Sequence, residues 1–313
     1  MTALFDVVLP VFLVIGFGYV VAWRGLLSET AVEGVMRFAQ SFALPVLLFQ
    51  SIARLDLSAD FNIPMLLAFY TGAFASFGIG VAGARWLGRP PEDAVAIGFA
   101  CLFSNSVLLG IPITERAYGP EALAANWMII AVHSPLLYTF GITVMEFTRA
   151  RGQNLSVGRV ALRALTGVLR TPLVIGIIAG LVMNILLSAG LILPGGFWEA
   201  VRMLATAALP AALFALGGIL FRYRPEGDSR AIALCCAASL ILHPVVTYGL
   251  GRTFGLEVPA LRSAVLTAAM APGVNAYLFA SIYGVAKRVA ASTVLVATAV
   301  SILTISVWLE ILP

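Results

Sequence analysis

Two apolar stretches of this sequence are interrupted by residues that could hold an anion inside a membrane. The first interruption covers residues 104–112 and contains Asn105, Ser106, Gly110 and Pro112. Proline removes a helical hydrogen bond and glycine adds backbone freedom, so both residue types tend to break an apolar helix. Where the helix resumes, its first N–H groups lack partners and carry the positive end of the helix dipole. Such an end suits a carboxylate.

A second interruption of the same kind lies in the other half of the chain. It contains Pro272, Gly273 and Asn275 within four consecutive positions. Each interruption runs on to a Tyr-Gly pair, and the pairs at 118–119 and 283–284 lie 165 residues apart. The two interruptions therefore occupy corresponding places in an internal repeat.

The repeat has a second sign at the same offset, because residues 42–49 resemble residues 207–214. Interrupted hydrophobic spans at matching positions of two repeats are the best sequence indication of a secondary transporter and of its substrate site. A proline kink is the alternative for either span alone, and helix-to-helix hydrogen bonding is the alternative role for Asn105 and Asn275. The matching positions, each with an asparagine nearby, favour substrate contact.

Two histidines lie in apolar segments. His133 is in the middle of the segment 123–147, where an ionisable side chain is a functional candidate that could hydrogen-bond an anion or carry a proton. Its alternative is a buried structural role, and for His243 the structural role is preferred. Asp6 and Glu146 lie towards segment ends, so a carboxylate proton relay or sodium cage is not predicted at mid-membrane.

The elements that must position these residues are membrane helices. The chain has 313 residues, of which 61% are hydrophobic and 11% charged, whereas soluble proteins have about 25% charged residues. A helix crossing a bilayer needs about 20 mostly apolar residues. Ten segments meet this need, and they are 3–22, 34–53, 62–87, 93–117, 123–147, 168–190, 198–221, 230–253, 260–283 and 289–311. The predicted fold is therefore an all-α integral membrane protein.

Ten spans and the repeat predict two five-helix units, 1–147 and 168–313, joined by a loop at 148–167. Because each unit has an odd number of spans, the second must be inverted relative to the first. Fourteen of the nineteen basic residues fall on one side of the predicted membrane, which indicates that this side is cytoplasmic. Both termini then face outward. The first span has no basic residue before it, so we expect it to be retained and not cleaved.

Several other classes of function are disfavoured by the sequence. It has no Walker motif, no His-Glu-x-x-His and no Gly-x-Ser-x-Gly, so no enzyme and no cofactor are predicted. The three cysteines lie in apolar spans and show neither metal-ligand nor disulfide spacing. The basic residues are spread over short loops, which does not suggest binding to nucleic acid.

Four places give the chain a specific likeness to a known family. They are residues 43–49, residues 105–112, the group of His133, Tyr138 and Glu146, and residues 271–284. With these residues the chain resembles the auxin efflux carrier family, within the wider bile acid and auxin transporter group, over almost its whole length. The resemblance implies two inverted five-helix repeats whose broken fourth and ninth helices cross at mid-membrane.

The same resemblance implies how the helices would work. Spans one, two, six and seven would form a scaffold, often a dimer interface. Spans three to five and eight to ten would move as a transport domain in an elevator-type cycle. Asn105 falls on the substrate-contacting asparagine of the family, and Tyr138 falls on a tyrosine near the pocket. His133 falls where the plant exporters carry glutamine, and prokaryotic members are linked to small carboxylates.

The sequence therefore predicts a carrier, expected to export a small organic anion across a bacterial inner membrane. The substrate would contact Asn105, Ser106, His133, Tyr138, Gly273 and Asn275, with Gly110, Pro112 and Pro272 breaking the helices. Two alternatives remain open. One is a sodium- or proton-coupled importer resembling the bile acid symporters, and the other is a membrane sensor that binds its ligand without transport.

Overall fold

Helices make up every regular element in the part of the chain that the structure describes. The computed structural model describes residues 3–56, 62–150, 169–223 and 226–313, together with 158, 162 and 165–167. Within these ranges seven helical stretches of 20 to 30 residues are long and apolar enough to cross a membrane. They are Leu4–Trp23, Glu29–Ala53, Ile63–Trp86, Pro120–Arg149, Gly195–Arg222, Ser229–Thr253 and Lys287–Ile311. The predicted all-α membrane class is confirmed.

Shorter apolar helices supply the rest. Helix α10 covers Pro172–Ser188. The predicted fourth span consists of α6 (Pro91–Leu102), the π-helical turn η3 (Ser106–Gly110) and α7 (Ile111–Tyr118). The predicted ninth span consists of α14 (Val258–Ala268) and α15 (Val274–Tyr283). The predicted loop at 148–167 lies largely outside the described residues.

At four places in the described helices, a π-helical turn ends two residues before a proline. These turns are η1 (Ala3–Val8), η2 (Ala39–Ala43), η3 and η5 (Ala238–Leu242), and the prolines are Pro10, Pro45, Pro112 and Pro244. The proline ring clashes with the carbonyl four residues earlier and cannot donate to it. The hydrogen-bond ladder shifts by one residue there, which is what a π-turn provides. Each helix then continues in α geometry.

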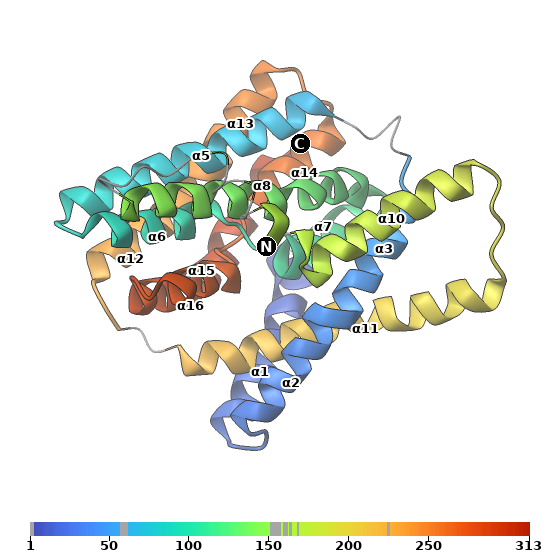
Figure 1. Cartoon of the computed structure of the whole chain (residues 1–313), viewed down its shortest axis with the longest axis horizontal. Coiled ribbons are helices and arrows are strands. Elements are labelled where there is room, and N and C mark those ends of the chain that lie inside the picture. The colour runs from blue at the N-terminus through green and yellow to red at the C-terminus, as the bar shows by residue number, and fades with distance from the viewer. Residues whose placement is uncertain are drawn as a thin grey trace.

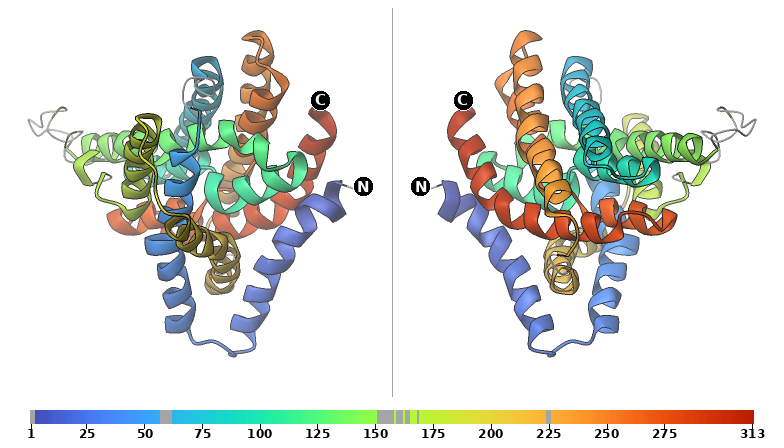
Figure 2. Two further views of the ribbon diagram at one scale, coloured as in Figure 1. Left: turned by 90° about the vertical axis from the view of Figure 1, so that its right-hand side faces the viewer. Right: turned by 90° about the vertical axis from the view of Figure 1, so that its left-hand side faces the viewer.

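One group of helices gathers around α11 (Gly195–Arg222), along the bottom and the right-hand side of Figure 1. Helix α1 (Leu9–Trp23) packs along α11, and α3 (Leu44–Ala53) packs along α10. Gly18 and Gly217 permit the first contact, since a Cβ atom at either position would overlap a backbone carbonyl of the facing helix. Figure 2 shows α1 and α2 (Glu29–Phe38) diverging as a V from the turn that joins them.

The second group contains the two interrupted spans. Helix α5 (Ile63–Trp86) packs against α6 and α13 (His243–Thr253), while α8 (Leu123–Arg149) packs against α6 and α14. Helices α12 (Ser229–Ala237), α15 and α16 (Lys287–Ile311) belong to the same group and lie on the left in Figure 1. Phe99 of α6 stacks on Phe279 of α15 with 3.9 Å between ring centroids. These aromatic rings fix the two interrupted spans against each other.

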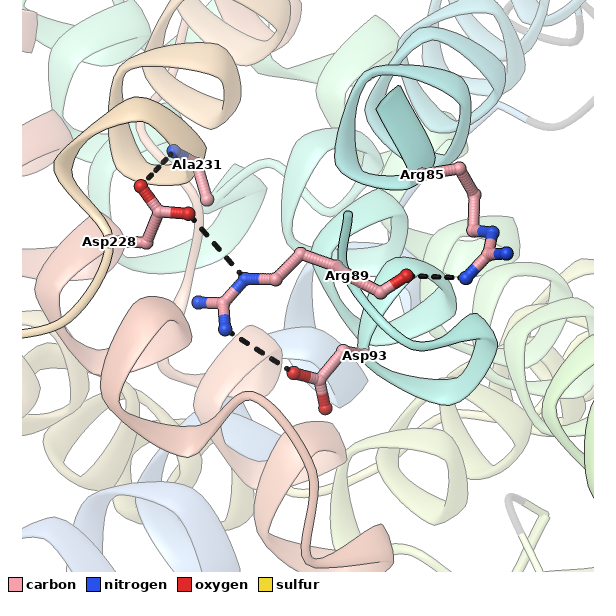
Figure 3. Close-up of polar contacts among 5 residues, drawn as sticks. All are labelled: Arg85, Arg89, Asp93, Asp228 and Ala231. Carbon is pink, nitrogen blue, oxygen red and sulfur yellow. Dashed lines mark hydrogen bonds and ion pairs between the residues drawn. The ribbon is translucent and has the colours of Figure 1, made fainter. Parts of the chain in front are cut away.

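A charged cluster joins the two sequence halves inside this second group (Figure 3). The Arg89 guanidinium lies 3.7 Å from the Asp93 carboxylate and 3.6 Å from the Asp228 carboxylate. Asp228 also caps α12 by accepting from the N–H groups of Arg230 and Ala231, and Arg85 donates to the Arg89 carbonyl. The cluster ties the turn before α6 to the start of α12.

A tyrosine stacked with an arginine from the opposite half closes each interrupted span. Tyr118 ends α7 before Gly119, and the Arg262 guanidinium lies 4.4 Å from its ring centroid. Tyr283 ends α15 before Gly284, and the Arg149 guanidinium lies 4.8 Å from its ring centroid. Gly119 and Gly284 both have positive φ angles, which explains why a glycine follows the tyrosine at both helix ends.

Candidate functional site

The two interrupted spans meet in a short backbone crossover. Helix α6 ends at Leu102 and α14 ends at Ala268, and Ser104 and Pro272 then pair as an isolated antiparallel bridge. The Asn105 N–H donates to the Ala271 carbonyl at 2.9 Å, and the Gly273 N–H donates to the Phe103 carbonyl at 3.1 Å. Each interruption therefore satisfies backbone groups that the other leaves open, as an apolar environment requires.

Two helices start at this crossover and run away from it. In the first, η3 and α7 begin at Ser106, and Asn105 caps the start by accepting from the Leu108 N–H at 3.2 Å. In the second, α15 begins at Val274 after Gly273. The first N–H groups of a helix have no carbonyl within the helix to bond to. Two positive helix ends therefore point toward one place.

A cavity of about 1070 Å³ opens at these helix ends. Its wall at the crossover contains Ser104, Asn105, Ser106 and Asn275, and Tyr138 and Glu146 of α8 and Ser281 of α15 extend this wall away from the crossover. The facing wall comes from η2, α3 and the start of α10, with Gln40, Ser41, Leu44, Thr171 and Leu173. Small-molecule pockets are typically about 300–1,000 Å³, so a small solute with some water fits here.

The side chains of Tyr138 and Asn275 are hydrogen-bonded to each other in the cavity wall. The Tyr138 hydroxyl donates to Asn275 Oδ1 at 3.2 Å. The Tyr138 ring packs against Phe99 and Phe103, each with centroids 5.4 Å away. Since the oxygen of the Asn275 amide accepts this bond, its NH₂ group is the part that remains to donate to a ligand.

His133 lies behind the crossover and is not part of the cavity wall. Its Nε2 is 3.2 Å from the Ser104 carbonyl, and the side chain is only 2% exposed. A carbonyl can only accept, so this bond requires the proton on Nε2. The ring also contacts Phe103 edge-on, with centroids 4.7 Å apart. The geometry makes His133 a support for the crossover backbone.

The other residues singled out from the sequence lie around the same point. Gly273 faces Asn105, where a Cβ atom would lie 3.6 Å from that side chain. Pro272 is in the bridge itself, whereas Gly110 and Pro112 lie in the helix that resumes after Asn105. His243 is apart from the cavity, with Nε2 3.2 Å from the Phe69 carbonyl.

Sequence reasoning missed the facing wall of the cavity. Gln40 and Ser41 directly precede the repeated segment 42–49, and Thr171 directly precedes the proline that starts α10. That proximity to the repeat and to a helix start was a signal that could have been followed. Nothing in the local sequence says that these segments lie opposite Asn275, because the contact is made between distant parts of the chain.

A second polar group, also missed, lies on the other side of the crossover. The Asn126 Nδ2 donates to Thr114 Oγ1 at 3.3 Å and to Thr267 Oγ1 at 2.8 Å, and all three side chains are fully buried. These bonds join α8, α7 and α14. An asparagine within an apolar segment was the available signal. In the described residues no three His, Cys, Asp or Glu side chains gather as a metal site.

Comparisons with known proteins give consistent matches. The family model described as "Membrane transport protein" matches residues 3–309. A Rhizobium meliloti protein named "Putative malonate transporter" is 27% identical over 311 residues, covering 98% of this chain and 95% of its own. The mouse lysosomal cholesterol signaling protein is 26% identical over 69% of this chain and 26% of its own. The rice auxin efflux carrier component 3a is 27% identical over 46% of this chain and 24% of its own.

Proposed function

Because the chain belongs to the membrane transport protein family, that of the auxin efflux carriers, we propose that it moves a small organic anion across a membrane. The observation that carries this proposal is the meeting of two helix N-termini at one wall of a cavity. Backbone N–H groups at such ends attract carboxylates without needing a charged side chain. This multi-pass membrane protein is then a secondary transporter and not an enzyme.

In the proposed complex, a substrate carboxylate lies between Asn105 and Asn275. It accepts from the first N–H groups of α15, from the amide NH₂ groups of Asn105 and Asn275 and from the Ser106 hydroxyl. The support is that these groups line one wall of the same cavity and that Tyr138 orients the Asn275 amide. The body of the substrate occupies the space beside Leu44 and Leu173.

The proposed topology has ten spans in two inverted repeats, 1–147 and 168–313, with the connecting loop 148–167 in the cytoplasm. Its support is the pairing of Tyr118 with Arg262 and of Tyr283 with Arg149, which join the two halves reciprocally. In the elevator cycle proposed here, spans one, two, six and seven stay fixed. Spans three to five and eight to ten then carry the crossover past the facing wall of the cavity.

The proposed direction is export from a bacterial cytoplasm across the inner membrane, with both termini in the periplasm. In this proposal the mouth of the cavity lies beside Glu146, near the end of α8 that leads into the loop 148–167, so the cavity faces the cytoplasm. A negative-inside potential drives an anion outward with about 2.3 kcal/mol per charge per 100 mV. The fixed spans would also supply the surface for pairing two copies.

Two rivals are separated by one experiment with purified protein in liposomes. Labelled short carboxylates are placed on one side, and exchange is measured with and without a sodium or proton gradient. The proposal expects saturable exchange that needs neither gradient. A clear requirement for a gradient would favour the coupled importer. Binding without any exchange would favour the sensor, an alternative raised by the name of the mouse relative.

A further inference from the structure

The cavity wall carries a negative side chain and no positive one over the residues that the structure describes. Glu146, near the mouth, is the charged member of that wall. Asn105, Ser106, Tyr138 and Asn275 at the inner end are all neutral hydroxyl or amide side chains. His133 is turned to the Ser104 carbonyl behind the wall. An anion in this cavity therefore depends on helix ends and neutral donors.

Arg149, one turn beyond Glu146, does not supply the missing cation. Its Nε donates to the Glu92 carboxylate at 2.9 Å, and its guanidinium lies over the Tyr283 ring. It also donates to the Tyr283 carbonyl. Glu92 thus balances the charge of Arg149. The Glu146 carboxylate hydrogen-bonds to the Tyr283 side chain, a neutral partner that does not cancel its charge, so Glu146 adds a net negative charge at the mouth.

A solute with one negative charge should bind in this cavity more favourably than a solute with two. Two half-helix ends provide roughly the equivalent of one positive charge in all. A second carboxylate in the same solute would lose water without gaining a cation, which is costly in a membrane interior. It would also meet the Glu146 carboxylate on the way through the mouth.

We infer that the substrate is a monoanion and that Glu146 is a specificity-determining residue that discriminates against dianions. The inference rests on the proposed function and narrows it to monocarboxylates. Leu44, Ile142 and Leu278 in the wall suit an apolar body, while Gln40 and Ser41 suit a neutral polar group on it. This expectation differs from the dicarboxylate in the name of the Rhizobium meliloti relative.

The size of the discrimination against dianions can be derived from the position of Glu146 on α8. Glu146 is eight residues beyond Tyr138 on α8, which places it about 12 Å along the helix axis. At about that distance, with an effective permittivity of about 20, repulsion between the Glu146 carboxylate and a second negative charge on the solute weakens binding of the solute by about tenfold.

The test compares malonate with its monomethyl ester, because the two solutes have similar size and differ by one charge near neutral pH. Exchange of each is measured in liposomes with wild type, Glu146→Gln and, as a matched control, Glu226→Gln. Glu226 lies outside the cavity wall on an exposed segment. We expect wild type to prefer the monoester by at least about tenfold, Glu146→Gln to reduce that preference, and Glu226→Gln to keep it.

The outcomes separate the inference from the proposed function. Equal or better exchange of malonate by wild type would overturn the monoanion inference while supporting carboxylate transport. An unchanged preference in Glu146→Gln would overturn the role of Glu146. Failure of both solutes, and of other short monocarboxylates tried with them, would overturn the proposed function itself.

Discussion

The hydroxyl of Tyr138 donates to Asn275 Oδ1 at 3.2 Å, which joins the second half of α8 to the first turn of α15. The bond decides which end of the Asn275 amide remains available to a ligand. Without it, the amide could rotate and present its oxygen to an incoming carboxylate. Substrate affinity is therefore coupled to a residue that need not touch the substrate.

Replacing Tyr138 with Phe keeps the ring packing against Phe99 and Phe103 and removes only the hydroxyl. We expect substrate binding to weaken by about fivefold, since one neutral hydrogen bond contributes about 1 kcal/mol. Titration calorimetry on the purified protein measures this. The control is Tyr19→Phe on α1, where the ring packs against Phe221 away from the cavity. Equal affinities of Tyr138→Phe and wild type would contradict the orienting role.

Replacing Asn105 with Ala removes both the cap on the Leu108 N–H and the proposed amide contact with substrate. Affinity should fall by at least about tenfold, because hydrogen bonds to charged groups contribute about 1.5–3 kcal/mol. A matched control is Asn184→Ala on α10, which loses bonds to the carbonyls of Ile52, Ala53 and Leu55. The control should melt at a lower temperature but keep the wild-type KM. If Asn105→Ala keeps the wild-type KM, the substrate does not bind at Asn105 and the proposed site is wrong.

His133 is tested by two substitutions that differ in hydrogen bonding. His133→Gln can still donate to the Ser104 carbonyl, so it should transport within about fivefold of wild type. His133→Leu removes this bond and leaves the Ser104 carbonyl with the Ser106 N–H as its partner, so transport should fall further than in His133→Gln. The measurement is the exchange rate in liposomes as a function of pH. If His133→Gln loses transport together with a pH-dependence present in wild type, the residue carries a proton and the coupled alternative gains support.

The proposed inward-facing state is tested by labelling single cysteines with a membrane-impermeant maleimide. The background variant lacks Cys101, Cys235 and Cys236. Ser41→Cys, in the cavity wall, should react when the reagent is applied from the cytoplasmic side. Glu121→Cys, exposed in the turn between α7 and α8, should react from the outside and serves as the topology control. Labelling of both from the same side would contradict the proposed orientation.

Local sequence signals accounted for part of this site. Proline, glycine and asparagine act on their own helix, so residues 104–112 and 272–275 identified the two interrupted spans. The exact end of α6 at Leu102 could not be read in the same way, because it depends on pairing with residues near Pro272. Similarly, His133 was recognisable as a polar residue in an apolar span. Its direction, toward the Ser104 carbonyl, was set by packing against Phe103.

The bridge between Ser104 and Pro272 has a consequence for biosynthesis, because its partners are 168 positions apart in the chain. When the first half enters the bilayer, the Asn105 N–H and the Phe103 carbonyl lack these partners until residues 271–273 have been made. Each unpaired group costs several kcal/mol in hydrocarbon. We therefore expect the early half to remain an incomplete insertion intermediate until the second half has been inserted. The final fold then requires α14 and α15 to insert and pack against the first half.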